Sequence, residues 1–306
     1  MSFQPDLTLT DARTTIDRAL ALARSLKQGG SFVIVDVGGG VVSASRIGEG
    51  PTSSMWISRA KAYVAAVQRA PSARSATQWR DRPAVFASMQ RLMRDDIFPG
   101  PGALPIRKNG RVVGALSTGG GIGPWTEVPD VDLSPLAGAN VEDYIISQAL
   151  GIPYQNQHPD VERLVGPRIE ERTDDLPHSL DAARRVADRA IADAERRGYR
   201  VGVAVVDEAG QLMQMDRMDG APPMAPDLAE AKALTALNFQ RPSLDVGRTL
   251  SADRLAEIRQ IAHFKILAGG GGVPIIVDGH VVGAVGVHGG GGGEQSDAVA
   301  RAAAER

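Results

Sequence analysis

An internal repeat constrains the fold of this 306-residue chain more than any other feature. The string FVIVDVGGGVVSASRIGEGP begins at Phe32, and VAVVDEAGQLMQMDRMDGAP begins at Val203, 171 positions later. At the same offset Lys61 aligns with Lys232. A second pair of strings, LPIRKNGRVVGALSTGG and VPIIVDGHVVGAVGVHGG, matches with an offset of 169. Since each half is long enough to be a domain, the sequence predicts two tandem copies of one fold.

The repeat also places the domain boundaries. We expect the first copy over 1–151 and the second over 177–306. The segment 152–176 between them is polar and contains prolines, as is typical of a linker. After its last strand the first copy has a longer stretch than the second, which predicts an inserted loop at about 124–140 that carries Trp125.

Each copy has the same predicted order of elements. Amphipathic patterns predict helices over 9–28 and 180–197. We expect Thr8 to cap the start of the first helix, and Gly29 and Gly198 to take a left-handed conformation after the two helices. Asn-Gly and Asp-Gly pairs predict hairpin turns between strands. The order of one helix, two strands, two helices, two strands and one helix predicts an α/β (α+β) fold, with an antiparallel sheet flanked by helices.

Composition excludes several classes of protein. The net charge is −2 and no basic run is present, so we expect no nucleic-acid partner. The absence of cysteine excludes disulfides and thiolate chemistry. No histidine pair has the spacing of a metal site, so no metal is predicted. Because the start lacks the pattern of a signal peptide and no apolar stretch is long enough to span a membrane, we expect a cytoplasmic protein with no membrane partner.

The motifs of the second copy resemble a known family. VAVVDEAGQLMQMDRMDGAPP, Ala-Lys-Ala at 231–233 and VPIIVDGHVVGAVGV are similar to the GlcG/HbpS-like family, which is often labelled haem-degrading. The first copy has RIGEGP where the family has R-M-D-G-A. The resemblance implies profilin-like or PAS-like domains that often self-associate, so a tandem chain would be a covalently joined dimer and a homo-oligomer is expected. It also implies a haem or another small-molecule ligand.

A histidine followed by five glycines marks the predicted site in the second copy. His288 stands where the family has a serine, at the end of the last strand, and glycines fill 289–293. A loop of this kind can aim several backbone N–H groups at an anion. The alternative is a loop that is merely tolerant and mobile. We therefore expect a small anionic ligand to be bound by Gly289, Gly290, Gly291 and Gly292.

Ionisable side chains near this corner suggest acid/base chemistry. The candidate catalytic residues are His288 and Glu294, which would move a proton, and Lys232, whose pKa burial would lower. For Lys232 the structural alternative is an ion pair with the turn residue Asp207 or with Asp219. Further ligand-binding candidates are Arg217, Asp219 and His263.

Other roles for these candidates stay open at this point. Arg217 and Asp219 could form a structural clamp over the loop. His263 lies off the apolar stripe of its predicted helix, so a surface position is the alternative. Asp36 and Asp207 are expected to form turns rather than to act in a site.

Three functions are compatible with the sequence. One is a cofactor-independent enzyme that acts on a small carboxylate or carbonyl compound in catabolism. Another is a haem-binding protein with His288 as axial ligand. The last is a non-catalytic assembly partner. Aromatic residues make up only 4% of the chain, and flat macrocycles prefer aromatic walls, so the sequence favours the small-molecule enzyme, which requires no cofactor.

Overall fold

The computed structural model describes residues 5–48, 50–79, 82–93, 97–98, 100–120, 139–157, 171–262 and 264–305. Trp125, most of the predicted insertion and the candidate ligand residue His263 lie outside the described residues. The chain divides into two compact units, Asp6–Glu171 and Arg172–Arg306 together with Met1–Pro5, and each is described by itself.

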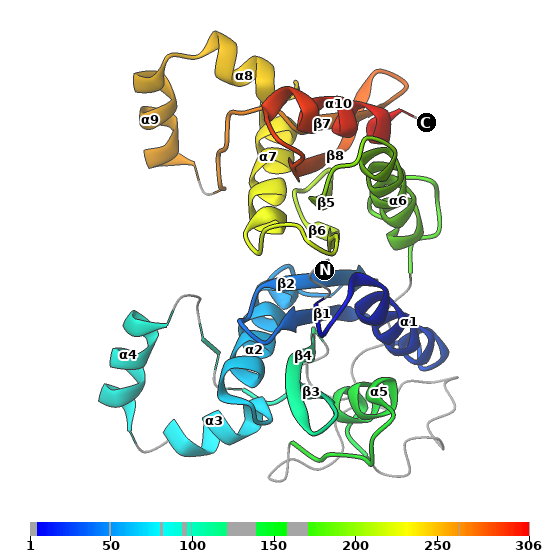
Figure 1. Cartoon of the computed structure of the whole chain (residues 1–306), viewed down its shortest axis with the longest axis vertical. Coiled ribbons are helices and arrows are strands. Elements are labelled where there is room, and N and C mark those ends of the chain that lie inside the picture. The colour runs from blue at the N-terminus through cyan, green and yellow to red at the C-terminus, as the bar shows by residue number, and fades with distance from the viewer. Residues whose placement is uncertain are drawn as a thin grey trace. The chain divides into compact units, whose positions relative to one another are not determined.

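The first unit is an antiparallel four-stranded sheet with helices packed against it (Figure 1). Its strand order is β3-β4-β1-β2. Its described elements are α1 (Leu9–Ser25), β1 (Gly30–Asp36), β2 (Val41–Ile47), α2 (Ser54–Gln68), α3 (Ser72–Trp79), α4 (Pro83–Leu92), β3 (Ala103–Lys108), β4 (Arg111–Gly119) and α5 (Val141–Leu150).

The second unit repeats this architecture, with strand order β6-β5-β8-β7. The predicted α+β fold with two tandem domains is therefore confirmed. Each unit has one short helix, α3 or α8, beyond the predicted order. The described elements of the second unit are α6 (Leu180–Arg196), β5 (Val201–Asp207), β6 (Leu212–Arg217), α7 (Ala225–Phe239), α8 (Ser243–Thr249), α9 (Ala252–Ile261), β7 (Gly272–Val277), β8 (His280–Gly289) and α10 (Gly293–Ala304).

The two turn aspartates act as the sequence predicts. Oδ1 of Asp36 accepts hydrogen bonds from the amides of Gly38 and Gly40, at 2.8 and 3.0 Å. Oδ1 of Asp207 accepts from the amides of Ala209 and Gln211, at 3.0 and 2.8 Å. These bonds hold the β1–β2 and β5–β6 hairpins closed.

The ends of the first helix follow the sequence only in part. Thr8 forms the predicted cap, since its hydroxyl accepts from the amide of Asp11 while the Asp11 carboxylate accepts from the amide of Thr8. The predicted role of Gly29 is wrong, because the helix ends at Ser25 and Lys27 takes the left-handed conformation with φ 50°. Gly198 takes the predicted left-handed conformation after α6, with φ 74°.

Close packing of α7 against β8 determines where the candidate site lies. A Cβ on Gly286 of β8 would lie 2.8 Å from the carbonyl carbon of Ala229 on α7, so only glycine permits this approach. Buried alanines on the same helix face, among them Ala233 and Ala236, contribute to this short separation. The side chain of Lys232 on α7 therefore reaches the end of β8.

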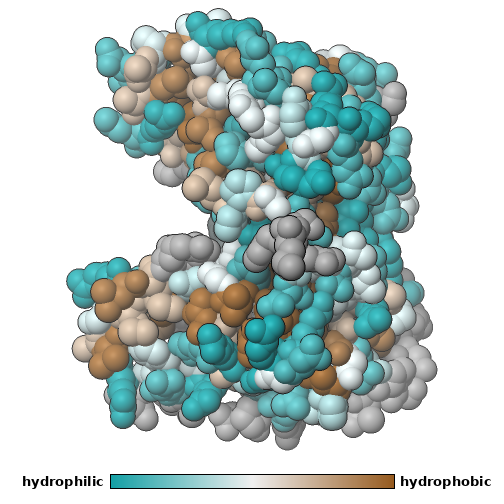
Figure 2. Space-filling view, in the orientation of Figure 1, coloured by the Kyte–Doolittle hydropathy of each residue, from teal (hydrophilic) through white to brown (hydrophobic). Residues whose placement is uncertain are grey.

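The side chains of α4 and α9, the last helix before the second hairpin of each unit, are mostly exposed to solvent. No residue of α4 is buried, and on α9 only Leu255 is. Phe86 packs partly against the first unit, but Leu92 is 80% exposed, and Ile261 on α9 is 77% exposed. Figure 2 shows apolar side chains at the surface over α4. These faces are consistent with the homo-oligomer that the sequence analysis expects, which stays a prediction.

Within the described part of the chain, no helix is both long and apolar enough to cross a membrane.

Candidate functional site

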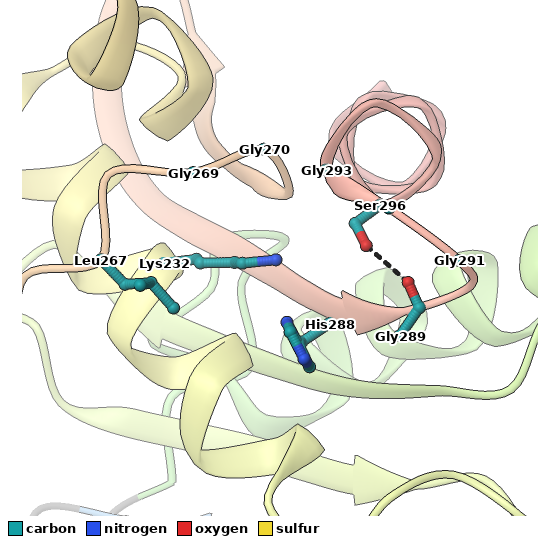
Figure 3. A pocket seen from close by; sticks show the side chains of 10 residues that line it. Lys232, Leu267, Gly269, Gly270, His288, Gly289, Gly291, Gly293 and Ser296 are labelled. Atoms are coloured by element: carbon teal, nitrogen blue, oxygen red, sulfur yellow. Dashed lines mark hydrogen bonds between the residues drawn. The ribbon is translucent and has the colours of Figure 1, made fainter.

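A hollow of about 390 Å³ lies where α7, the end of β8 and the start of α10 meet (Figure 3). Its volume is in the range of small-molecule sites. The loop that precedes β7 forms a further wall. The lining consists of Lys232, Leu267, Gly269, Gly270, His288, Gly289, Gly291, Gly292, Gly293 and Ser296.

Two glycine-rich loops form most of the pocket lining, and several of their positions require glycine for a steric reason. Gly289 and Gly291 have φ of 124° and 93°, which residues with a side chain rarely adopt. A Cβ on Gly270 would lie 2.6 Å from the carbonyl carbon of Gly293, the first residue of α10. The two loops therefore touch through their backbones, and their polar groups border the hollow.

Lys232 is the charged group of this pocket. Lys232 is only 5% exposed, and its Nζ donates a hydrogen bond to the carbonyl oxygen of Val287 at 3.0 Å. Burial lowers the pKa of Lys232 from 10.5 to about 8, although the charge of Asp297 acts in the opposite direction. No carboxylate in the described part of the chain lies within 4.0 Å of its ammonium, so neither Asp207 nor Asp219 is its partner.

His288 extends from the end of β8, close to Lys232 (Figure 3). Its Nδ1 is buried and has no hydrogen-bond partner. Burial lowers the pKa of His288 below 6.5, and the charge of Lys232 lowers it further. Both effects favour the neutral imidazole, which carries a nitrogen able to accept a proton.

The first turn of α10 closes the pocket. The hydroxyl group of Ser296 on this helix donates a hydrogen bond to the carbonyl oxygen of Gly289, at 2.7 Å (Figure 3). Gly292 stands at the N-cap without a side-chain cap, so the amides of the first turn face the loop. A helix start and a buried ammonium on the same hollow favour a negatively charged ligand.

A family model described as "Haem degrading protein HbpS-like" matches residues 7–125 and 179–305. The chain belongs to this HbpS-like family. The two matched regions correspond to the two copies of the repeat, so this protein is a tandem member.

Individual proteins resemble one copy at a time. Protein GlcG of Escherichia coli K12 is 34% identical over 95 residues, which cover 31% of this chain and 69% of GlcG. A double mutant of HbpS from Streptomyces reticuli is 33% identical, with a TM-score of 0.38, and the match covers 44% of this chain and 88% of that one. A PduOC–haem complex is 25% identical, with a TM-score of 0.38, over 41% of this chain and 91% of that one.

The name of the HbpS-like family raises the question whether these residues fit a haem. His288 offers a partnerless ring nitrogen, which suits an axial ligand. The walls suit the macrocycle less well, because Leu267 is the only large apolar side chain among the described lining residues and none of them is phenylalanine, tyrosine or tryptophan. The lining therefore fits a small polar ligand better than a flat apolar one.

Some of the residues that the sequence analysis nominates lie elsewhere. The side chain of Glu294 is 81% exposed and lies 3.5 Å from Arg248. Arg217 at the end of β6 and Asp219 beyond it are not among the described lining residues. A Cβ on Gly290 would contact the ring of Tyr199, outside the pocket. The structure thus brings together Lys232, His288, Gly289, Gly291 and Gly292.

Sequence analysis missed one whole wall of the pocket, which includes Leu267, Gly269 and Gly270, and it missed Ser296 on α10. A signal for the wall was present, since four consecutive glycines occupy 269–272, and the last of them is the first residue of β7. Only the contact between the two loops shows that the second glycine run faces the first.

Proposed function

We propose that the second copy binds a small anionic carboxylate or carbonyl compound in this pocket and carries out acid/base chemistry on it. The observation that carries the proposal is the ammonium of Lys232, which is buried beside two glycine loops with no carboxylate within ion-pair distance in the described structure. A buried charge of this kind needs a counter-charge, and a ligand anion would supply it.

The residues have distinct roles in this proposal. Lys232 anchors the anionic group, and the amides of Gly291 and Gly292 donate hydrogen bonds to developing negative charge on an oxygen. His288 takes or returns a proton, since its neutral imidazole has a buried nitrogen without a partner. A catalytic role in catabolism and a cytoplasmic location remain parts of the proposal.

Replacing Lys232 with methionine tests the anchor. We expect Lys232→Met to weaken the binding of pyruvate, a probe that carries both a carboxylate and a carbonyl group, by about 10- to 100-fold, because one charge-assisted hydrogen bond is lost. Isothermal titration calorimetry measures the change. Lys265→Met removes an exposed lysine of the same unit and should leave the affinity unchanged. Equal affinity in the wild type and Lys232→Met would refute the proposed function.

Binding should depend on pH in a defined window. The pKa of Lys232 is lowered to about 8, so its ammonium is charged below this pH and neutral above it. We expect the affinity for pyruvate to be nearly constant from about pH 7 to pH 8, and to fall by up to about tenfold for each further pH unit. Titrations across this range measure the change. An affinity that stays flat to about pH 9.5 would contradict a role for Lys232.

Haem binding is the second candidate, and the partnerless Nδ1 of His288 is the observation that favours it. In that case His288 would supply an axial ligand, and the absorption spectrum of the protein mixed with haemin would change in His288→Ala. The third possibility from the sequence, a non-catalytic assembly partner, would leave both pyruvate and haemin unbound.

A further inference from the structure

The first copy contains a lysine in the same surroundings as Lys232. A Cβ on Gly271 would lie 3.1 Å from Nζ of Lys232 and 2.9 Å from Cβ of Ser296, and it would also clash with the carbonyl oxygen of Val287. A Cβ on Gly102, the equivalent glycine of the first copy, would meet three corresponding neighbours. These neighbours are Nζ of Lys61, the carboxylate of Glu142 and the carbonyl oxygen of Thr118.

The comparison assigns Glu142 and Ser296 to equivalent positions. Both precede a buried aspartate at the start of the last helix of their copy, and the buried Ile145 and Ile146 of α5 match Val299 and Ala300 of α10. The position that carries a hydroxymethyl group in the second copy thus carries a carboxylate in the first. His288 has Gly119 as its counterpart, since these residues pair with Gly202 and Ser31 respectively.

Glu142 neutralises the lysine of the first copy. Its Oε2 lies 3.6 Å from Nζ of Lys61, and the two side chains are 7% and 1% exposed. Neither carboxylate oxygen of Glu142 has a hydrogen-bond partner in the described structure. The carboxylate is therefore held in place by Lys61 and by burial.

We infer that the carboxylate of Glu142 occupies, in the first copy, the place that a ligand carboxylate takes beside Lys232 in the second. This inference rests on the proposed function and deepens it: the ligand is a small carboxylate, and the first copy is closed by a built-in equivalent of that ligand. Each chain then has one working pocket.

The size of the two side chains supports the assignment. Glutamate and serine share the first methylene group, and beyond it glutamate carries roughly one acetate unit where serine carries a hydroxyl. Exchange of Glu142 for serine therefore removes about the volume and charge of one acetate from the first copy. Acetate itself is the natural probe for the space that this exchange opens.

Chemical rescue tests the inference. We compare Glu142→Ser with Glu142→Gln, both in the Lys232→Met background, which weakens binding to the second copy equally in the two variants. Both variants leave Lys61 without its carboxylate, but glutamine keeps the space filled. We expect acetate to raise the unfolding midpoint of Glu142→Ser at least twice as much as that of Glu142→Gln, because binding to the folded state stabilises it. Circular dichroism verifies that both variants fold.

Labelling of Lys61 gives a second readout that does not depend on stability. An amine-reactive reagent followed by peptide mass mapping should modify Lys61 in Glu142→Ser and not in the wild type, and acetate should protect it more strongly than inorganic phosphate does. Equal midpoint shifts in the serine and glutamine variants, or equal protection by acetate and phosphate, would overturn the inference. The pyruvate titrations of the wild type test the second copy and do not depend on these results. Failure of the inference is therefore distinguishable from failure of the proposed function.

Discussion

Lys61→Met is expected to lower the free energy of unfolding of the first unit by about 3–5 kcal/mol, because it leaves the carboxylate of Glu142 buried without its partner. For a domain of this size the loss corresponds to about 2–4 °C in the unfolding midpoint for each kcal/mol. Differential scanning calorimetry of the variant measures the change directly.

The equivalent change in the second copy should behave differently. The lowering of the Lys232 pKa from 10.5 to about 8 corresponds to about 3 kcal/mol of unfavourable burial of its charge. Lys232→Met relieves this cost, but it leaves the carbonyl of Val287 without a donor, which costs about 1–3 kcal/mol. The first effect is at least as large as the second, so we expect Lys232→Met to leave the stability unchanged or to raise it by up to about 2 kcal/mol.

A double variant controls for loss of packing at Lys61. Lys61→Met combined with Glu142→Gln removes both charges, and we expect it to recover most of the stability that Lys61→Met loses. If Lys61→Met and Lys232→Met were destabilised equally, the contrast between a paired and an unpaired buried lysine would be wrong.

Gly270→Ala is expected to destabilise the second unit by about 1–3 kcal/mol and to abolish binding of pyruvate. The added methyl group would lie 2.6 Å from the carbonyl carbon and 3.1 Å from Cα of Gly293, so either the loop or the start of α10 must move. Since both border the pocket, the movement changes its shape. Thermal unfolding and calorimetric titration measure the two effects.

The neighbouring glycine provides a matched control. A Cβ on Gly269 would meet no atom within 4 Å, and its φ is outside the left-handed region. We expect Gly269→Ala to change stability by less than about 0.5 kcal/mol. Destabilisation of the same size in both variants would show that the contact between the loops does not shape the site.

Much of the fold follows from sequence patterns alone. The repeat predicts two copies, and the hairpin turns with Asp36 and Asp207 predict antiparallel pairing, because these signals are local and each acts within a few residues. The end of α1 shows the limit of local signals. Gly29 is available, but the chain turns at Lys27, since the position of the helix end depends on how α1 packs against the sheet.

The sequence by itself also indicated part of the candidate site, namely Lys232, His288 and, from the glycine run that follows, Gly289, Gly291 and Gly292. Only the tertiary structure decided which other residues join them. Glu294 is next to the glycine run in sequence yet points into solvent, whereas Gly270 and Ser296 come from other elements and border the pocket.

The partner of each lysine was likewise a tertiary outcome. Lys61 and Lys232 have the same place in the repeat, and each stands in the same Ala-Lys-Ala string. The last helix of the first copy brings the carboxylate of Glu142 to Lys61. The last helix of the second copy carries Ser296 at that position, and Lys232 donates to the carbonyl oxygen of Val287 on β8. The free energy of a buried ammonium depends on the charges within a few ångströms of it, and those distances are set by how the helices pack on the sheet.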